Sequence, residues 1–358
     1  MRLKMSRRTF LKVTGTAVLA GALAGCGGSG SGGGGNGGNP GGGNGPENPG
    51  GGEEPGNPGG GEDKPSSGKK EQGYYTAAVP DTQGVYWTYY YSGSGTEVSL
   101  TGYNSHKGAR PNGNVTLPST LDGLRVTKVD SNAFNMLEKI DKEMSPETEN
   151  YTWSNFSAVT EMVVPTGIEV IGEWAFNACV NDGVGTHRTA TMLKKVTFLG
   201  KTVLCHGVFF DCDKLEEIVG MENLITGNSL GWGACFNNTG FRELHIASNL
   251  MYCELFAGCK KLEKVTIQKG IPVIRWRVFS NCDALSKIYI PTSVTSIEEE
   301  AFYVSDYEEE EVKEKVKLTV YYGGSEAQWK NLMQKTADGN DRLKDAKVLY
   351  GQNPDDMK

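Results

Sequence analysis

The segments "LFAGCKKLEKVTI" (Leu255 to Ile267) and "VFSNCDALSKIYI" (Val278 to Ile290) repeat one pattern 23 residues apart. Phenylalanine, cysteine and leucine keep their spacing, and two apolar residues separated by a polar or aromatic one follow. Alternation with a period of two predicts a short β-strand. The segment before it predicts a turn or short helix whose Phe, Cys and Leu side chains point inward.

The same pattern recurs through the chain. Well-kept copies lie at Phe176 with Cys179, Phe209 with Cys212, Phe256 with Cys259 and Phe279 with Cys282, and altered copies lie at Phe134, Phe236 and Phe302. A unit of about 23 residues cannot bury its own apolar face, so it has to stack on neighbours that carry the same face. The sequence therefore predicts a repeat solenoid, a coil of short parallel β-strands joined by short helical or irregular turns. Polar insertions at residues 138–157 and 180–192 interrupt the spacing and predict surface loops.

This repeat resembles the BspA-like class of bacterial leucine-rich repeats. Two flanking stretches strengthen the resemblance, "TYYYSGSGTEVSLTGY" (Thr88 to Tyr103) as an opening cap and "VYYGGSEAQWKNL" (Val320 to Leu332) as a closing segment. The resemblance implies a right-handed leucine-rich-repeat-like coil. It implies an N-terminal cap and first repeat at residues 74–134, repeats with insertions at residues 135–322, and a C-terminal cap at residues 323–358. It also implies a protein of adhesion or interaction, and no enzyme.

The first 26 residues have the character of an export signal. Basic residues precede about a dozen small apolar ones, a run too short to remain as a membrane-spanning helix. The stretch around Arg7 and Arg8 resembles a twin-arginine signal, and Leu23-Ala24-Gly25-Cys26 resembles a bacterial lipobox. The resemblance implies a signal peptide at residues 1–25, lipidation of Cys26 and a membrane-anchored lipoprotein on a bacterial cell surface. The general secretory route stays open beside the twin-arginine route.

Residues 26–73 predict a disordered tether. After Cys26 they consist mostly of Gly, with Asn, Pro, Ser and charged residues, and they contain no aromatic or β-branched residue. Such a segment cannot offset the entropy lost on ordering. A flexible Gly-rich chain of this length has a root-mean-square reach of roughly 40 Å. The tether is therefore expected to hold the repeats away from the membrane.

The charge balance excludes nucleic acid as a partner. The chain has a formal net charge of −7, and without residues 1–25 it has 31 basic and 43 acidic residues. Nucleic acids and anionic membrane surfaces both require a clustered positive field. No basic stripe is present in the repeats, so attachment to a membrane is expected through the lipid on Cys26.

The cysteines and histidines do not predict a metal site, a cofactor or a catalytic residue. Four of the seven cysteines after Cys26 share one position of the repeat, and neither C-x-x-C nor a ligand spacing with histidine occurs. They are therefore interpreted as small buried thiols. Cys205, Cys235 and Cys253 fall outside this position, and pairing among them stays open. Trp174, Trp232 and Trp276, just before the repeated Phe, are either an aromatic row for glycans or, as favoured here, a half-buried edge.

The strands predict a binding face. In each strand the residue between two inward apolar positions should face away from the core. The expected face consists of Thr197, His245, Thr266 and Tyr289, flanked by Lys195, Glu217 and Lys264. The expected partner is an extracellular protein or glycan, bound by a monomer. An exported enzyme or cofactor-binding protein, and a structural spacer of the envelope, remain the alternatives.

Overall fold

The computed structural model describes residues 70–104, 106–134, 156–181, 186–188, 191–226, 233–247, 250–305 and 316–357, with the backbone alone described at 179–181, 186–188 and Thr226. The chain divides into two units, Met1–Ser67 and Gly68–Lys358. The predictions for Arg7, Arg8, Cys26 and most of the tether lie outside the described residues. All that follows concerns the second unit.

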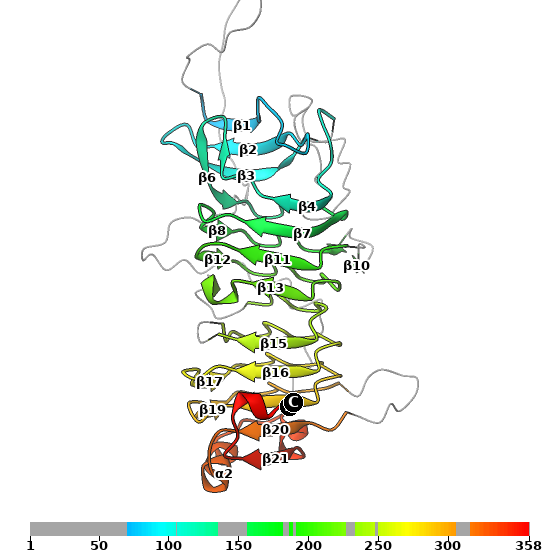
Figure 1. Ribbon diagram of the computed structural model, residues 1–358, viewed down its shortest axis with the longest axis vertical. Coiled ribbons are helices and arrows are strands. Elements are labelled where there is room, and N and C mark those ends of the chain that lie inside the picture. The colour runs from blue at the N-terminus through cyan, green and yellow to red at the C-terminus, as the bar shows by residue number, and fades with distance from the viewer. Residues whose placement is uncertain are drawn as a thin grey trace, which may run out of the picture. The chain divides into compact units, whose positions relative to one another are not determined.

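Parallel strands stack in chain order along one side of this unit (Figure 1). One sheet contains β4 (Gly113–Thr116), β7 (Val159–Val164), β11 (Lys195–Phe198) and β13 (Glu217–Val219). A second contains β15 (Glu243–Ile246), β16 (Lys264–Ile267), β18 (Lys287–Ile290), β20 (Thr319–Tyr322) and β21 (Lys347–Tyr350). Every neighbouring pair in both sheets is parallel. The predicted coil of short parallel strands is confirmed.

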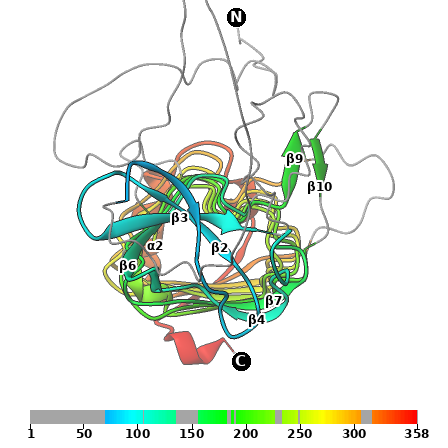
Figure 2. The same ribbon diagram turned by 90° about the horizontal axis from the view of Figure 1, so that it is seen from above.

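A further set of strands forms another side of each coil, so that the coils superpose when viewed along the stack (Figure 2). β6 (Leu124–Val129), β8 (Val170–Ile171), β12 (Thr202–Leu204) and β14 (Leu224–Thr226) lie side by side in parallel, as do β17 (Val273–Ile274) and β19 (Ser296–Ile297). The 3-10 helix η1 (Met221–Asn223) connects β13 to β14. One coil therefore carries a strand on each of two sides and then the turn that holds the repeated phenylalanine.

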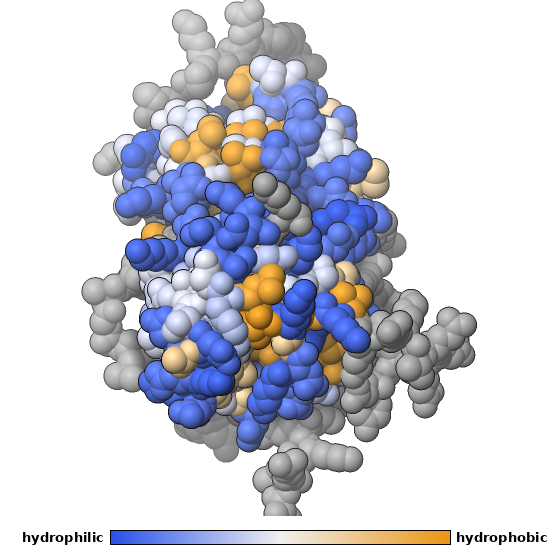
Figure 3. Space-filling view, turned by 60° about the horizontal axis from the view of Figure 1, so that its bottom comes forward, coloured by the Kyte–Doolittle hydropathy of each residue, from blue (hydrophilic) through white to orange (hydrophobic). Residues whose placement is uncertain are grey.

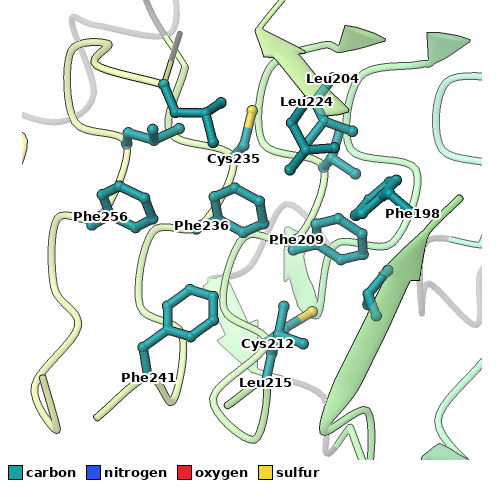
Figure 4. Close-up of a cluster of buried hydrophobic side chains, with 14 of the residues drawn as sticks. Phe198, Leu204, Phe209, Cys212, Leu215, Leu224, Cys235, Phe236, Phe241 and Phe256 are labelled. Carbon is teal, nitrogen blue, oxygen red and sulfur yellow. The ribbon is translucent and has the colours of Figure 1, made fainter. Parts of the chain in front are cut away.

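The repeated phenylalanines form a ladder through the interior, here called the phenylalanine ladder: Phe134, Phe176, Phe209, Phe236, Phe256, Phe279 and Phe302. All seven are buried, and consecutive ring centroids lie 5.1 to 6.2 Å apart. Figure 4 shows Phe209, Phe236 and Phe256 in one row, with Cys212 on one side of the row and Cys235 on the other. Aromatic pairs at such distances contribute about 0.5 to 1.5 kcal/mol beyond the burial of their area. The ladder therefore joins coil to coil.

A sharp turn precedes every phenylalanine of the ladder. The residue two positions before each ring has a positive φ, between 32° and 65°: Asn132, Trp174, Gly207, Ala234, Glu254, Arg277 and Glu300. Non-glycine residues in this region are strained by about 1 kcal/mol or more. Backbone bonds between coils hold the turn in place; for example, the Trp174 amide donates to the His206 carbonyl and the Glu254 amide to the Trp276 carbonyl.

The cysteine position is also buried, and its thiols bond to the preceding coil. Cys212 Sγ donates to the Phe176 carbonyl over 3.2 Å, and Cys282 Sγ donates to the Phe256 carbonyl over 3.3 Å. In the coil of Phe236, Thr239 takes the position and donates to the Phe236 carbonyl over 2.8 Å. No disulfide joins the six cysteines whose side chains the structure describes. The interpretation as buried thiols is confirmed for Cys212, Cys259 and Cys282, whereas the side chain of Cys179 lies outside the description.

The N-terminal end of the stack is closed by three antiparallel strands, β1 (Gly73–Thr76), β2 (Trp87–Tyr91) and β3 (Glu97–Tyr103). On its other edge β3 pairs in parallel with β6, which joins the cap to the coils. The short β5 (Thr120–Leu121) pairs with β6. The Trp87 ring meets Phe134 edge-on at 6.1 Å and ends the phenylalanine ladder. Lys70 and Tyr89 both donate hydrogen bonds to Asp122, so the residues just before β1 are fastened to this cap.

The C-terminal end is closed by α2 (Glu326–Gln334), α3 (Asp341–Lys344) and the buried Asn340 between them. Elsewhere in the ladder each phenylalanine amide donates to a carbonyl of the next coil, as Phe279 does to Ala301. No further phenylalanine of the ladder follows Phe302 among the described residues, and the Phe302 amide donates instead to Asn340 Oδ1 over 3.1 Å. The Asn340 amide group donates in turn to the Glu298 and Ala337 carbonyls. One side chain thus takes the place of the backbone carbonyl that receives the phenylalanine amide in the earlier coils, while the Glu300 amide still donates to the Asp338 carbonyl.

The two predicted insertions have different outcomes. Residues 180–192 include the antiparallel hairpin of β9 (Cys179–Asn181) and β10 (Thr186–Arg188), which projects from the coils in Figure 2. Residues 135–155 lie outside the described part. The prediction that this insertion extends to residue 157 is wrong, because Phe156 is buried and its ring contacts Phe134 and Phe176. An apolar ring so placed belongs to the core of the following coil.

Candidate binding face

The two stacked sheets of β4 to β13 and β15 to β21 share an outer face with two rows of side chains. Along these strands inward residues such as Val196, Leu244 and Ile288 are buried. The residues that alternate with them along the same strand point outward. The first row is Asn114, Glu161, Lys195, Glu217, Glu243, Lys264, Lys287, Thr319 and Lys347. The second row is Thr116, Val163, Thr197, Val219, His245, Thr266, Tyr289, Tyr321 and Leu349.

All seven residues of the predicted binding face lie on this outer face: Lys195, Glu217 and Lys264 in the first row, and Thr197, His245, Thr266 and Tyr289 in the second. The strand register sets neighbours opposite each other, with Lys195 beside Glu217 and Thr266 between His245 and Tyr289. Alternation in short strands was sufficient to place them together. Their role in binding stays a prediction.

Charges in the first row pair across strands. Lys195 Nζ lies 2.9 Å from Glu217 Oε1, and Lys264 Nζ lies 2.9 Å from Glu243 Oε1. His245 Nε2 lies 3.3 Å from the same Glu243 oxygen. The hydrogen bond from Lys264, with smaller contributions from the charge of Lys264 and from His245, lowers the pKa of Glu243 despite some burial. Exposed pairs of this kind contribute at most about 1 kcal/mol, so they order the face more than they stabilise the fold.

Thr266 departs from the prediction, because only 6% of it is exposed. It points outward, but the larger His245 and Tyr289 flank it on both neighbouring strands. Alternation gives the direction of a side chain and does not give what covers it. Thr266 is therefore not an accessible contact residue in this structure.

The chain's last described residues lie over the outer face; residues 351–357 are called here the C-terminal segment. The Gly351 amide donates to the Gly324 carbonyl over 2.9 Å and the Gln352 amide to the Tyr322 carbonyl over 3.0 Å, which turns the chain back from β21. The 3-10 helix η2 (Pro354–Asp356) follows. Figures 1 and 2 both place this segment outside the coils, in front of the five-stranded sheet.

Met357 and Asp356 are the two residues of this segment that relate it to the outer face. Met357 is only 1% exposed and does not belong to the hydrophobic core cluster of the coils. Burial raises the pKa of Tyr289, and the negative charge of Asp356 raises it further. Sequence reasoning missed this contact. The available signal was Asn353-Pro354-Asp355-Asp356, a helix start with proline at its first position, followed by an isolated methionine.

The two sheets differ in the chemistry of their outer faces. The first row of the N-terminal sheet has two glutamates and one lysine, and that of the C-terminal sheet has one glutamate and three lysines. The second row has small or β-branched side chains in the N-terminal sheet, but His245, Tyr289 and Tyr321 in the C-terminal sheet. Figure 3, which brings the C-terminal end forward, shows hydrophobic areas within a mainly hydrophilic surface.

The tryptophans before the ladder are a structural edge. Trp174 is half-buried, and its ring meets His206 at 4.7 Å and Phe210 at 5.5 Å. A Cβ atom on Gly207 would lie 2.4 Å from the Trp174 ring, so glycine makes room for this packing. The Arg277 guanidinium lies 4.6 Å from the half-buried Trp276 ring, and Trp232 lies outside the description. The interpretation of Trp174 and Trp276 as a half-buried edge is confirmed.

Among the described residues, no three His, Cys, Asp or Glu side chains gather into a group that could hold a metal ion. In the same part of the chain, no helix combines the length and the apolar character that crossing a bilayer requires.

Comparison with known proteins finds the family described as "BspA type Leucine rich repeat region", with six copies matched over residues 102–204, 127–254 and 233–322. No curated protein matches the chain. A leucine-rich repeat protein from Bacteroides ovatus has 18% identity and a TM-score of 0.43, over 66% of this chain and 53% of that protein.

Two further solved structures are similar at the same level. A leucine rich cell surface protein from Faecalibacterium prausnitzii has 17% identity and a TM-score of 0.39, over 80% of this chain and 56% of that one. A leucine-rich repeat protein from T. pallidum has 18% identity and a TM-score of 0.40, over 66% and 92%. The chain thus spans about half the length of the first two proteins. At this similarity the family assignment depends on the six matched repeats and not on the solved structures.

Proposed function

This chain belongs to the BspA-type leucine-rich repeat family, and on that premise we propose that it is a cell-surface lipoprotein that binds an extracellular protein or glycan through its outer face. The observation that carries the proposal is the contrast between the two sides of the same strands. Inward positions repeat from coil to coil, whereas outward positions change from Thr197 to His245 to Tyr289. The fold requires the first set and leaves the second available for recognition.

The size of the face sets an expected strength of binding. Nine strands spaced about 4.8 Å apart, each about 13 Å long, give roughly 500 Å². That is below the roughly 800 Å² that each partner contributes to a standard stable interface. A single contact should therefore be weak, and many tethered copies on one surface would raise the avidity. The Gly-rich segment after Cys26 suits this arrangement, because it lets neighbouring molecules engage together.

The binding test uses the full chain and charge-matched variants. Lys195→Glu changes the first row of the face, and Lys269→Glu makes the same change in the exposed turn after β16. Both are compared with the unchanged chain for binding to immobilised extracellular-matrix proteins and to a glycan array. The proposal expects Lys195→Glu to weaken binding at least fivefold and Lys269→Glu to leave it unchanged. Equal effects of the two variants would contradict it.

The anchor is tested separately in cells of a lipoprotein-exporting bacterium. Cys26→Ser should release the protein from the membrane fraction, because the lipid is attached to the cysteine thiol, which serine lacks. Replacement of Arg7 and Arg8 by lysine should hold the chain in the cytosol if the twin-arginine route is used. Retention of Cys26→Ser in the membrane fraction would contradict the lipoprotein proposal without affecting the proposal for the outer face.

A further inference from the structure

The C-terminal segment lies on the outer face while making few bonds to it. Beyond Gln352, the hydrogen bonds of the described residues 353–357 stay within the segment: Asn353 donates to Asp356, Asp356 to Asn353, and Met357 to Pro354. Its internal bonds form a compact turn that holds its own shape. Side chains are then left to hold residues 353–357 in place, and Met357 is the buried one among them.

The charges of the segment and of the sheet below it are complementary. The segment carries Asp355 and Asp356, both exposed, one of which acts on Tyr289. The first row of the five-stranded sheet carries Lys264, Lys287 and Lys347 against one acid, Glu243. Residues two apart in a strand are about 6.6 Å apart, so these lysines border the second row that holds Tyr289. An acidic turn with an apolar anchor fits this surface in both respects.

We propose that the outer face of β18 and β20 is a docking site for an acidic peptide segment that presents an apolar side chain beside its acids. In this structure the chain's own C-terminal segment occupies the site. The inference deepens the proposed function and depends on it in one respect: the partner that uses this half of the face is a protein, which must displace the segment.

The C-terminal segment is a covalently attached competitor, and it weakens the binding of an external peptide by an amount that can be calculated. A short flexible connection gives a local concentration on the order of millimolar. The apparent affinity of an external peptide falls by the fraction of molecules whose site is open. Removing the segment should therefore strengthen peptide binding without adding a contact.

The test measures the binding of a labelled peptide with the sequence of Gly351 to Met357 to two forms of the full chain, one unchanged and one ending at Tyr350. The shortened form is expected to bind the peptide saturably and at least tenfold more tightly. A peptide with serine in place of its methionine, and another with asparagines in place of its aspartates, should each lose at least fivefold. Equal binding by the two forms of the chain would overturn the proposal.

A second variant protects the test against a loss of folding on truncation. Met357→Ser keeps the chain length and the turn, and it is expected to raise peptide binding at least threefold. Tyr289→Ala in the shortened chain should abolish the gain, whereas Thr197→Arg, in the other sheet, should leave it. A gain that survives Tyr289→Ala, or a shortened chain that binds a glycan and no peptide, would overturn the proposal.

The outcome separates this inference from the proposed function. If the peptide does not bind while Lys195→Glu still weakens surface binding at least fivefold, the acidic-peptide site is wrong and the function of the outer face stands. If the peptide binds while Lys195→Glu leaves surface binding unchanged, the docking site stands and the proposed function is wrong.

Discussion

The interior and the outer face of this protein are built from the same short strands, but only the interior repeats. The inward strand residues Val196, Leu244 and Ile288 are all apolar and buried, whereas the outward residues beside them differ in size and charge. The comparison shows that repetition in this sequence encodes the stack of coils. Function is to be sought where repetition fails, at the outward positions and at the two ends.

The largest expected effect comes from breaking the repeated interior. Phe236→Ala removes a buried ring that lies 5.7 Å from both Phe209 and Phe256. Loss of a buried phenylalanine costs about 3 to 5 kcal/mol, because the cavity adds to the lost burial. Urea unfolding followed by circular dichroism measures it. A loss below about 1 kcal/mol would show that the ladder does not hold the coils together.

The end of the ladder should be nearly as sensitive as its middle. Asn340→Ala leaves the buried Phe302 amide without its acceptor and removes the donors to the Glu298 and Ala337 carbonyls. Unsatisfied buried groups cost about 1 to 3 kcal/mol each, so a total of about 2 to 3 kcal/mol is expected. The exposed Asn353→Ala serves as control in the same urea experiment. Similar midpoints for the two variants would refute the capping role.

At the N-terminal cap the expected effect depends on pH. Burial raises the pKa of Asp122, but hydrogen bonds from Lys70, Tyr89 and the Ala78 amide outweigh burial and lower it below 3.8. A lowered pKa means that the carboxylate stabilises the fold above its unfolded value, and that this stabilisation disappears as pH falls through the folded value. Asp122→Asn should cost about 1 kcal/mol at pH 7, discounted for solvent exposure, and almost nothing near pH 2. Thermal unfolding at both pH values checks this, and an equal cost at both would contradict it.

Ionisation of Glu254 should have the opposite effect on stability to ionisation of Asp122. Burial raises its pKa above 4.5, and Arg277 only partly offsets this. A raised pKa means that the ionised carboxylate opposes folding at neutral pH, a penalty that disappears below pH 4.5. Glu254→Gln should stabilise the chain by about 0.5 kcal/mol at pH 7 and leave it unchanged at pH 4. Destabilisation at pH 7 would mean that the contact with Arg277 outweighs burial.

The sequence predicted the features that recur. The spacing of Phe256 and Phe279 gave the coil, and the alternation around Thr197 and Tyr289 gave the residues of the outer face. The sharp turn before each ring was not predictable, because residues as different as Trp174 and Glu254 occupy it. Hydrogen bonds between coils impose its conformation, and local preference favours positive φ only where Asn132 and Gly207 stand.

Single contacts between distant parts of the chain could not be predicted either, because they leave no recurring pattern in the sequence. Asn340 reaches Phe302 across 38 residues, and one asparagine in a polar stretch carries no sign of that bond. The C-terminal segment on the outer face was missed for the same reason. Thr266 shows the consequence, since its direction followed from alternation and its burial did not.

The central claim is that the interior determines the fold while the outer face is left for binding. The most direct test measures the urea midpoint and the surface binding of one variant, Lys195→Glu with Thr197→Arg. The account predicts a loss of stability of at most about 1 kcal/mol, since Lys195 gives up only its partly exposed pair with Glu217, together with loss of binding. Unchanged binding, or a loss of stability approaching that of Phe236→Ala, would contradict it.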